Sequence, residues 1–287
     1  MKKVAILGTG AMGSRIAANL LEIGYELNVW NRTPERCASL VEQGATQYPF
    51  PKDAVRNADV VIAMLSNDDA SRDVWTDKKT GATSGLKKGA IAIEYSTLSL
   101  AWCLELSDTI HEHQVDFLDA PVVGSRPQAD ASQLIHLVGG DSKILKKVDK
   151  ILSVSSSAIH YTGETGSGMS MKLAVNGLFG MQVAAFGEII GMLNKSGISK
   201  ESAVNLLNEL PVTSPAMKGI GLAISSGNFD PLFPIDLVEK DFGYLEQLSK
   251  LLGSNIPLVN ITKDIYQQAI KSGYGKNNIA GVAQLYL

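Results

Sequence analysis

The residues best suited to acid–base chemistry lie near position 170, where Lys172 and Asn176 stand four positions apart in an apolar stretch. Residues at that spacing share one face of a helix. A lysine on a buried apolar helix needs a partner or a wet cavity, and burial would lower its pKa toward neutrality. Lys172 could then exchange a proton near physiological pH, while Asn176 could orient a bound molecule. The alternative is a structural lysine that reaches solvent from the helix end.

A glycine-rich segment near the N-terminus has the GxGxxG pattern and follows a short apolar run. In that setting Gly8 permits a tight turn, Gly10 lets a pyrophosphate approach the backbone, and Gly13 lets the next helix pack on the strand. The N–H groups at the start of the helix complete an anion site. We therefore expect a dinucleotide to bind at Gly8, Gly10, Ala11, Met12 and Gly13. A glycine-rich turn without a ligand is the alternative.

The end of the second expected strand indicates which dinucleotide binds. NAD enzymes usually carry an acid there for the ribose 2′-hydroxyl, whereas this chain has Asn31, Arg32 and Thr33. A guanidinium binds a 2′-phosphate in a charge-assisted pair, and we expect the Asn31 and Thr33 side chains to help. The sequence therefore predicts NADP, used as NADPH for reduction. A solvated Arg32 beside a helix-capping Thr33 is the alternative.

Polar residues also follow two later strands, at the sheet edge where ligands bind in open α/β folds. We assign Leu65 and Ser66 to the cofactor site and Ser96 to the substrate site. Either pair of strand ends could instead supply helix caps. A further turn at Val123, Gly124 and Ser125 can present backbone N–H groups to a substrate carboxylate, with an ordinary surface turn as the alternative.

The order of expected elements predicts an α/β fold, with an N-terminal Rossmann-type doubly wound sheet followed by an all-α domain that has a long central helix. Amphipathic helical patterns separate most of the strands. The expected strands are Val4–Leu7, Glu26–Trp30, Asp59–Leu65, Ala90–Ser96, Val115–Ala120, Leu134–Val138 and Ala158–Thr162. We place a nucleotide-binding domain at 1–163 and a helical substrate and oligomerisation domain at 164–287. Its expected helices are about 166–195, 199–209, 236–252 and 257–272.

Composition excludes several classes of function. A formal net charge of -3 leaves no basic field for nucleic acid. Cys37 and Cys103 stand apart without ligand-type neighbours, which argues against a zinc site or disulfide framework and suits the cytoplasm. The apolar stretch 173–193 is long enough to imitate a membrane span, yet it contains Asn176 and Glu188, so we expect a buried helix. The four histidines are expected to be structural.

Several of these motifs occur together and in order, and through them the chain resembles the β-hydroxyacid dehydrogenase family. This family includes 3-hydroxyisobutyrate dehydrogenase and glyoxylate or succinic semialdehyde reductases. The matching motifs are the glycine-rich loop 8–13, Asp119-Ala120-Pro121-Val122 with Gly124, Gly166 and Gly168 with Lys172 and Asn176, and Phe233-Pro234 with Lys240-Asp241. The resemblance spans nearly the whole chain.

The resemblance implies a role for each matching residue. Lys172 would be the catalytic acid/base, Asn176 would orient substrate, and segment 123–125 with Phe233 would bind a carboxylated substrate. Thr97 and Lys240 would contact the cofactor, and Asn31-Arg32-Thr33 looks like the NADP-using reductases. The long helix would help to build a homodimer or homotetramer.

Three positions depart from the family pattern: Val123 stands where Ser is common, Ser125 where many members have a second Gly, and Ser132 where Gly is usual. The loss of a hydroxyl at Val123 leaves backbone N–H groups to hold a carboxylate, so the substrate is open. We expect hydride transfer between the nicotinamide and a small carboxylated alcohol or carbonyl compound.

Two other functions are weighed against this one. An imine reductase would use the same cofactor but typically replaces the lysine that this chain keeps. A non-catalytic NADP-binding module would bind cofactor without turnover, and retention of both Lys172 and Asn176 counts against it. A 6-phosphogluconate dehydrogenase is disfavoured because the helical part is short and no basic cluster for a sugar phosphate is evident.

Overall fold

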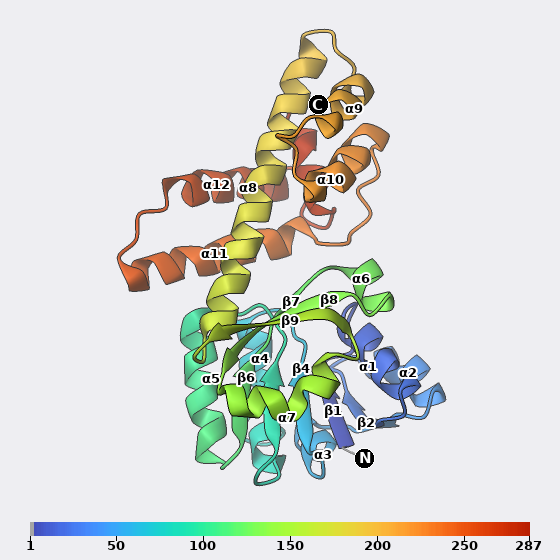
Figure 1. The fold of residues 1–287 in the computed structure, drawn as a ribbon, viewed down its shortest axis with the longest axis vertical. Coiled ribbons are helices and arrows are strands. Elements are labelled where there is room, and N and C mark those ends of the chain that lie inside the picture. The colour runs from blue at the N-terminus through green and yellow to red at the C-terminus, as the bar shows by residue number, and fades with distance from the viewer. Residues whose placement is uncertain (1–2) are drawn as a thin grey trace. The chain divides into compact units, whose positions relative to one another are not determined.

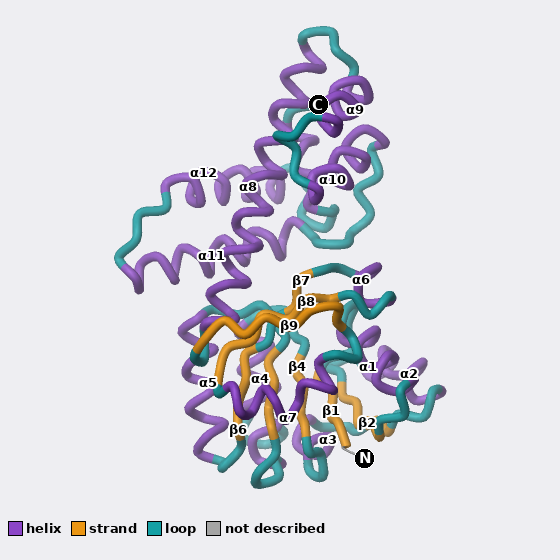
Figure 2. Tube along the Cα trace, in the orientation of Figure 1, coloured by secondary structure: helices purple, strands orange, loops and turns teal. Residues whose placement is uncertain are grey.

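A nine-stranded sheet occupies the first half of the chain, and the computed structural model describes residues 3–287 (Figures 1 and 2). The strands alternate with helices along the sequence, as the pattern predicts. The strands are β1 (Lys3–Leu7), β2 (Glu26–Trp30), β3 (Thr46–Gln47), β4 (Val60–Ala63), β5 (Ile91–Glu94), β6 (Asp116–Asp119), β7 (Val122–Val123), β8 (Leu134–Gly140) and β9 (Ser156–Gly163).

Six strands follow the order β3-β2-β1-β4-β5-β6 and run parallel, which is the order of a Rossmann dinucleotide-binding sheet. Strand β8 then joins β6 antiparallel and pairs with both β7 and β9. The chain order reverses between β1 and β4. Ligands bind beside such a switch point, at the carboxyl ends of the strands, so the glycine turn after β1 is placed at the binding edge.

Helices cover both faces of this sheet, so it is doubly wound. One apolar core lies under α1 (Gly13–Glu22), α2 (Ala38–Glu42), α6 (Arg126–Asp130) and α7 (Ser142–Leu152). The other core lies under α3 (Pro51–Val55), α4 (Asp68–Thr76) and α5 (Leu100–Glu112). Strand residues are buried throughout β4 and β5, as parallel strands covered on both faces require. Three short 3₁₀ segments are η1 (Pro34–Cys37), η2 (Ala82–Gly85) and, near the C-terminus, η3 (Ile279–Leu285).

The second half of the chain is helical. It contains α8 (Ser167–Lys195), α9 (Lys200–Glu209), α10 (Pro215–Ser226), α11 (Ile235–Leu252) and α12 (Pro257–Lys271). A separate apolar core is formed by these helices with η3. The chain divides into two compact units between Lys172 and Leu173, so α8 starts in the first unit and continues through the second.

The long helix α8 is apolar and long enough to cross a membrane by those criteria alone. One of its faces is packed inside the second unit, where a Cβ added at Gly180 would lie 2.5 Å from the Phe242 ring and one added at Gly187 would lie 3.0 Å from Ala283. Glycine therefore permits close packing of α8 against its neighbours. This is how the core helix of a helical unit behaves.

The predicted fold class is confirmed, and the departures from the predicted elements are local. Strands β3 and β7 were not predicted because two residues cannot show a period-two pattern. Helix α10 was also not predicted. Pro215 at its first turn starts it, and Gly227 ends it in a left-handed conformation with φ +69°, but Gly219 and Gly221 weaken its helical pattern.

His136 on β8 is structural, as expected of the histidines. Its side chain is fully buried, its Nδ1 lies 3.3 Å from the carbonyl oxygen of Ala120, and its ring lies 4.7 Å from the ring of Tyr95. Burial lowers the pKa of His136 to about 4, because the charged imidazolium loses its hydration. The folded protein therefore keeps this ring neutral while the unfolded chain binds a proton below pH 6.5.

We predict that His136→Phe reduces the loss of stability on acidification. Between about pH 6.5 and pH 4 the unfolded chain binds more protons at this site than the folded protein, so stability falls as pH falls, by on the order of 3 kcal/mol for this group. Urea unfolding at pH 7 and pH 4.5 should show a smaller difference in His136→Phe than in the wild type. The exposed His160→Phe is the control. Equal differences in all three proteins would contradict the prediction.

Candidate active site

The glycine turn joins β1 to α1, and glycine is needed at its three positions for different reasons. Gly8 has φ +99°, and a Cβ at Gly8 or Gly13 would collide with a carbonyl oxygen, of Met64 and of Gly8 respectively. By contrast, nothing lies within 4 Å of a Cβ built at Gly10. The fold therefore requires Gly8 and Gly13, whereas the open space at Gly10 fits the approach of a phosphate group to the backbone.

The start of α1 is suited to an anion. Its N-cap residue, Met12, makes no side-chain cap hydrogen bond, and no acidic residue lies in the first turn. The N–H groups of Ser14, Arg15 and Ile16 bond to the carbonyl oxygens of Gly10 and Met12. A ligand would therefore be bound by the N–H groups of the turn before them, where the start of the helix carries a partial positive charge. A pyrophosphate is a suitable acceptor for them. The predicted residues Ala11 and Met12 stand at this position.

Asn31, Arg32 and Thr33 follow β2, and the Asn31 amide makes two hydrogen bonds to its surroundings. Its Oδ1 accepts the Thr9 N–H at 3.1 Å, and its Nδ2 donates to the Thr33 carbonyl oxygen at 2.9 Å. The Asn31 side chain therefore braces the glycine turn. Its amide keeps further donor capacity, so its part in binding a 2′-phosphate stays a prediction. Arg32 and Thr33 are exposed, and Thr33 makes no side-chain cap hydrogen bond.

The predicted residues after β4 and β5 are hydrogen-bonded to each other. The Ser96 hydroxyl accepts the Leu65 N–H at 2.7 Å, which joins a cofactor-assigned residue to a substrate-assigned one. Ser66 and Thr97 follow them on the same two loops. The helix caps in this region are instead Asn67, which accepts the Ala70 N–H, and Ser99, which accepts the Trp102 N–H.

A buried acid that sequence reasoning missed holds this pair of loops. Glu94, the last residue of β5, is fully buried and accepts hydrogen bonds from Ser96 N at 3.0 Å, Trp75 Nε1 at 2.9 Å and Ser71 Oγ at 3.2 Å. Burial raises the pKa of Glu94, and the hydrogen bonds from Ser96 and Trp75 oppose that rise. Its carboxyl group thereby fixes the start of the Ser96–Thr97 loop against α4.

Lys172 lies in the second turn of α8 and is buried, with 7% of its surface exposed. The turn before it is attached to the rest of the first unit. Met169 is fully buried, and its sulfur accepts the Leu98 N–H at 3.1 Å. Leu98 follows Thr97, so this contact links the loop after β5 to the turn that precedes the lysine.

Asn176 lies one turn further along α8, on the same helix face as Lys172. Within the second unit, its Nδ2 donates to Asp241 Oδ2 at 2.6 Å, and Lys240 Nζ lies 3.1 Å from Asp241 Oδ1. Asp241 belongs to the Lys240-Asp241 motif, but the sequence alone predicts a role only for Lys240. Its buried carboxylate orients the Asn176 amide and pairs with the predicted cofactor residue Lys240. Because an amide has further donor and acceptor capacity, Asn176 can still bind a ligand.

Phe233 is half-buried in the loop before α11 of the second unit, where its N–H donates to Asn278 Oδ1 at 3.2 Å. Its ring packs against the apolar core of that unit. The backbone of Phe233 is therefore fixed by a side chain from the C-terminal segment. This contact links two segments that are 45 residues apart in sequence.

In the turn predicted to bind a carboxylate, residues 123–125, the N–H of Ser125 is used in a hydrogen bond within the protein. Gly124 has φ +122°, and Ser125 caps the short helix α6 in a capping box in which the Ser125 N–H donates to Gln128 Oε1 at 2.9 Å. That N–H is therefore already satisfied within the capping box, while the assignment of segment 123–125 to a substrate carboxylate stays a prediction. Ser132 has φ +54°, and this left-handed conformation explains why glycine suits the position.

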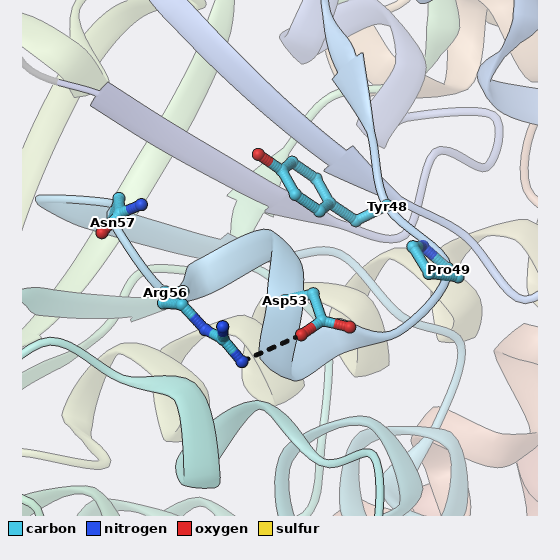
Figure 3. A pocket seen from close by; sticks show the side chains of 5 residues that line it. All are labelled: Tyr48, Pro49, Asp53, Arg56 and Asn57. Carbon is cyan, nitrogen blue, oxygen red and sulfur yellow. Dashed lines mark hydrogen bonds and ion pairs between the residues drawn. The ribbon is translucent and has the colours of Figure 1, made fainter.

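A shallow hollow elsewhere in the first unit is lined by Tyr48, Pro49, Asp53, Arg56 and Asn57, with an Arg56–Asp53 ion pair of 3.2 Å (Figure 3). None of the predicted site residues lines it. Among residues 3–287, no group of three or more His, Cys, Asp or Glu side chains could hold a metal ion. In the first unit the predicted site residues follow the carboxyl ends of the strands or lie at the head of α8, whereas Asn176, Phe233 and Lys240 belong to the second unit.

Comparison with known proteins decides the family. Residues 3–163 match the family described as the NAD binding domain of 6-phosphogluconate dehydrogenase, and residues 166–286 match NAD-binding of NADP-dependent 3-hydroxyisobutyrate dehydrogenase. Glyoxylate/succinic semialdehyde reductase 1 of Arabidopsis thaliana is 30% identical over 98% of this chain and 97% of its own length. The chain belongs to the β-hydroxyacid dehydrogenase family. It is therefore an oxidoreductase with a pyridine-nucleotide-binding domain.

Solved structures agree with membership of this family. The Mycobacterium tuberculosis 3-hydroxyisobutyrate dehydrogenase with L-serine is 25% identical and has a TM-score of 0.90, over 99% of both chains. An imine reductase from a Pseudomonas species is 20% identical with a TM-score of 0.64, over 99% of this chain and 98% of its own, and shares the fold.

We predict that Gly10→Ala impairs cofactor binding without destabilising the protein. The added Cβ meets no protein atom within 4 Å, but it occupies the space through which a pyrophosphate approaches the backbone. Thermal unfolding should be unchanged, while the Kd for NADPH, measured by fluorescence titration, should rise at least about tenfold. Gly219→Ala on α10, which also meets no atom within 4 Å, is the control. An unchanged Kd for Gly10→Ala would rule out this role of Gly10.

Proposed function

We propose that this protein is an NADP-dependent reductase or dehydrogenase of small carboxylated alcohols and carbonyl compounds, with Lys172 as its general acid/base. The observation that carries the proposal is a buried lysine at the head of α8, followed one turn later by an asparagine that Asp241 holds in place. A buried lysine one helical turn before an oriented amide is a suitable arrangement for donating a proton to an oxygen that develops negative charge.

Each residue has a defined part in the proposed reaction. When bound, the nicotinamide exchanges a hydride with the reacting carbon of the substrate. In reduction, Lys172 donates a proton to the alkoxide oxygen, and in oxidation its neutral amine accepts the hydroxyl proton. Asn176 donates a hydrogen bond that orients the substrate. Asp241 prevents the Asn176 amide from rotating, because a carboxylate accepts only from the nitrogen end.

The proposed substrates are short carbonyl acids or hydroxyacids. Support comes from the related glyoxylate/succinic semialdehyde reductases and from the 3-hydroxyisobutyrate dehydrogenase structure. In this chain the predicted carboxylate turn at 123–125 lacks a side-chain hydroxyl at Val123, and the Ser125 N–H is taken by Gln128. Fewer groups are therefore available there to select one particular acid.

The proposed cofactor is NADP rather than NAD, and Arg32 supports this choice. It is exposed directly after β2, where an NAD enzyme would carry an acid, and the neighbouring Asn31 is committed to the glycine turn. The guanidinium is thus the charged group at this position that can bind a 2′-phosphate.

We also propose that the protein is a cytoplasmic homodimer or homotetramer. In the described chain, α8 exposes Met171, Leu178, Ile189 and Met192, with between 42% and 58% of each side chain's surface accessible. Large apolar side chains in one stripe favour contact with another chain. Cys37 and Cys103 are buried and unpaired, which fits a reducing compartment.

Retention of Lys172 favours carbonyl reduction over imine reduction or cofactor binding alone. We predict that Lys172→Ala lowers kcat with glyoxylate or succinic semialdehyde by about 10²–10⁴-fold and leaves the Kd for NADPH within about twofold. Lys195→Ala, at the exposed end of the same helix, is the control. An NADPH-oxidation screen should include cyclic imines. Unchanged turnover in Lys172→Ala, or wild-type turnover confined to imines, would rule out the proposed reaction.

We predict that Arg32→Ala weakens NADPH binding by about tenfold or more and changes NADH binding little, because the two cofactors differ by the 2′-phosphate. The measurement is the pair of Kd values for each variant. Arg56→Ala, which removes another exposed arginine, should change neither value. Equal weakening of NADPH and NADH in Arg32→Ala would contradict the NADP assignment.

A further inference from the structure

A second buried acid, Asp119, stands at the carboxyl end of β6 and contacts the head of α8. Its side chain is fully buried, its Oδ1 accepts the Gly166 N–H at 2.8 Å, and its Oδ2 accepts the Met169 N–H at 2.7 Å. Both oxygens of one carboxyl group thus hold the turn that leads to Lys172. The sequence gap of 47 to 50 residues makes this a tertiary contact rather than a local helix cap.

Gly139 and Gly168 lie so close to the Asp119 carboxyl group that a side chain at either position would contact it. A Cβ at Gly168 would collide with the Leu137 carbonyl oxygen and lie 2.9 Å from Asp119 Oδ2. A Cβ at Gly139, on β8, would lie 2.5 Å from Asp119 Oδ1. The backbone therefore packs against the carboxyl group from two sides. Gly168, four residues before Lys172, permits this close packing.

The charge on Asp119 suits its place at the start of a helix. The first N–H groups of α8 carry partial positive charge, and an ionised carboxylate is their strongest acceptor. Burial raises the pKa of Asp119 to about 6, and the bonds from Gly166 and Met169 oppose that rise. At neutral pH the group is therefore ionised and bound at both oxygens.

We propose that Asp119 is a positioning residue for the reaction: its carboxylate holds the Gly166–Met169 turn and thereby fixes where the Lys172 ammonium group lies. The inference rests on the proposed role of Lys172. Met169 is three residues before Lys172, so a shift of the held turn moves the lysine directly. The Leu98 N–H bond to the Met169 sulfur is a second attachment of this turn, to the loop that follows Thr97.

The test is a double-mutant cycle of Asp119→Asn and Lys172→Ala. Asparagine keeps the shape but turns one acceptor oxygen into a donor that faces a backbone N–H. Alone, Asp119→Asn should lower kcat per NADPH-binding site by about 10–100-fold, since a misplacement of about 1 Å costs that order of rate. In the double variant, kcat should stay within about threefold of Lys172→Ala alone, because Asp119 acts through the lysine.

Controls separate positioning from loss of fold. Active sites are counted by NADPH titration. Val148→Ala creates a cavity in the core under α7 and so destabilises the protein, but it should leave kcat per site unchanged. If Asp119→Asn does not fold, Gly139→Ala displaces the same carboxylate from β8 and replaces it in the cycle.

The outcomes distinguish the inference from the proposed function on which it rests. If Lys172→Ala keeps full turnover, the proposed function fails. If Lys172→Ala loses turnover but Asp119→Asn does not, or if the two losses multiply in the double variant, the positioning role of Asp119 is wrong and the proposed function stands. A loss in Asp119→Asn that disappears against the Lys172→Ala background supports the inference.

Discussion

Burial of two carboxyl groups at the carboxyl edge of the sheet is the constraint on which the arrangement of this site depends. A buried acid must accept hydrogen bonds, since its desolvation is otherwise too costly. Glu94 at the end of β5 takes its donors from α4 and the Ser96 loop, while Asp119 at the end of β6 takes its donors from the head of α8. Satisfying both acids therefore fixes the loop that carries Ser96 and the first turn of α8, which precedes Lys172.

Much of the fold follows from patterns that are local in sequence. Buried strands show as short apolar runs, and the GxGxxG segment predicts its turn from glycine spacing alone. Gly13 is required by packing against Gly8 within the turn, whereas Gly8 is required by the approach of Met64. The antiparallel pairing of β8 with β6 and β7 does not follow from such local patterns, because it depends on tertiary contacts between strands. Alternation of strands and helices carries no information about that pairing.

The sequence indicates residues proposed to act directly more readily than residues that hold them in place. Lys172, Asn176 and the glycine turn were predicted from residue type and spacing. Glu94, Asp119 and Asp241 hold those segments through contacts that span many residues, up to 65 for Asn176 and Asp241. A signal was available: each of the first two is an acid that directly follows buried apolar strand residues, a position where an unpaired charge is costly.

The residues that hold Lys172, the proposed proton donor, are separate from those expected to select the substrate. Lys172 depends on β6 and α8, whereas the departures from the family pattern fall at Val123, Ser125 and Ser132, around β7 and α6. Ser132 keeps its left-handed backbone at a cost of about 1 kcal/mol rather than changing the turn. Since the turn survives an unfavourable residue, its shape is set by the surrounding sheet. Under the proposed function, substitutions there would change which acid binds without changing the residues that hold Lys172.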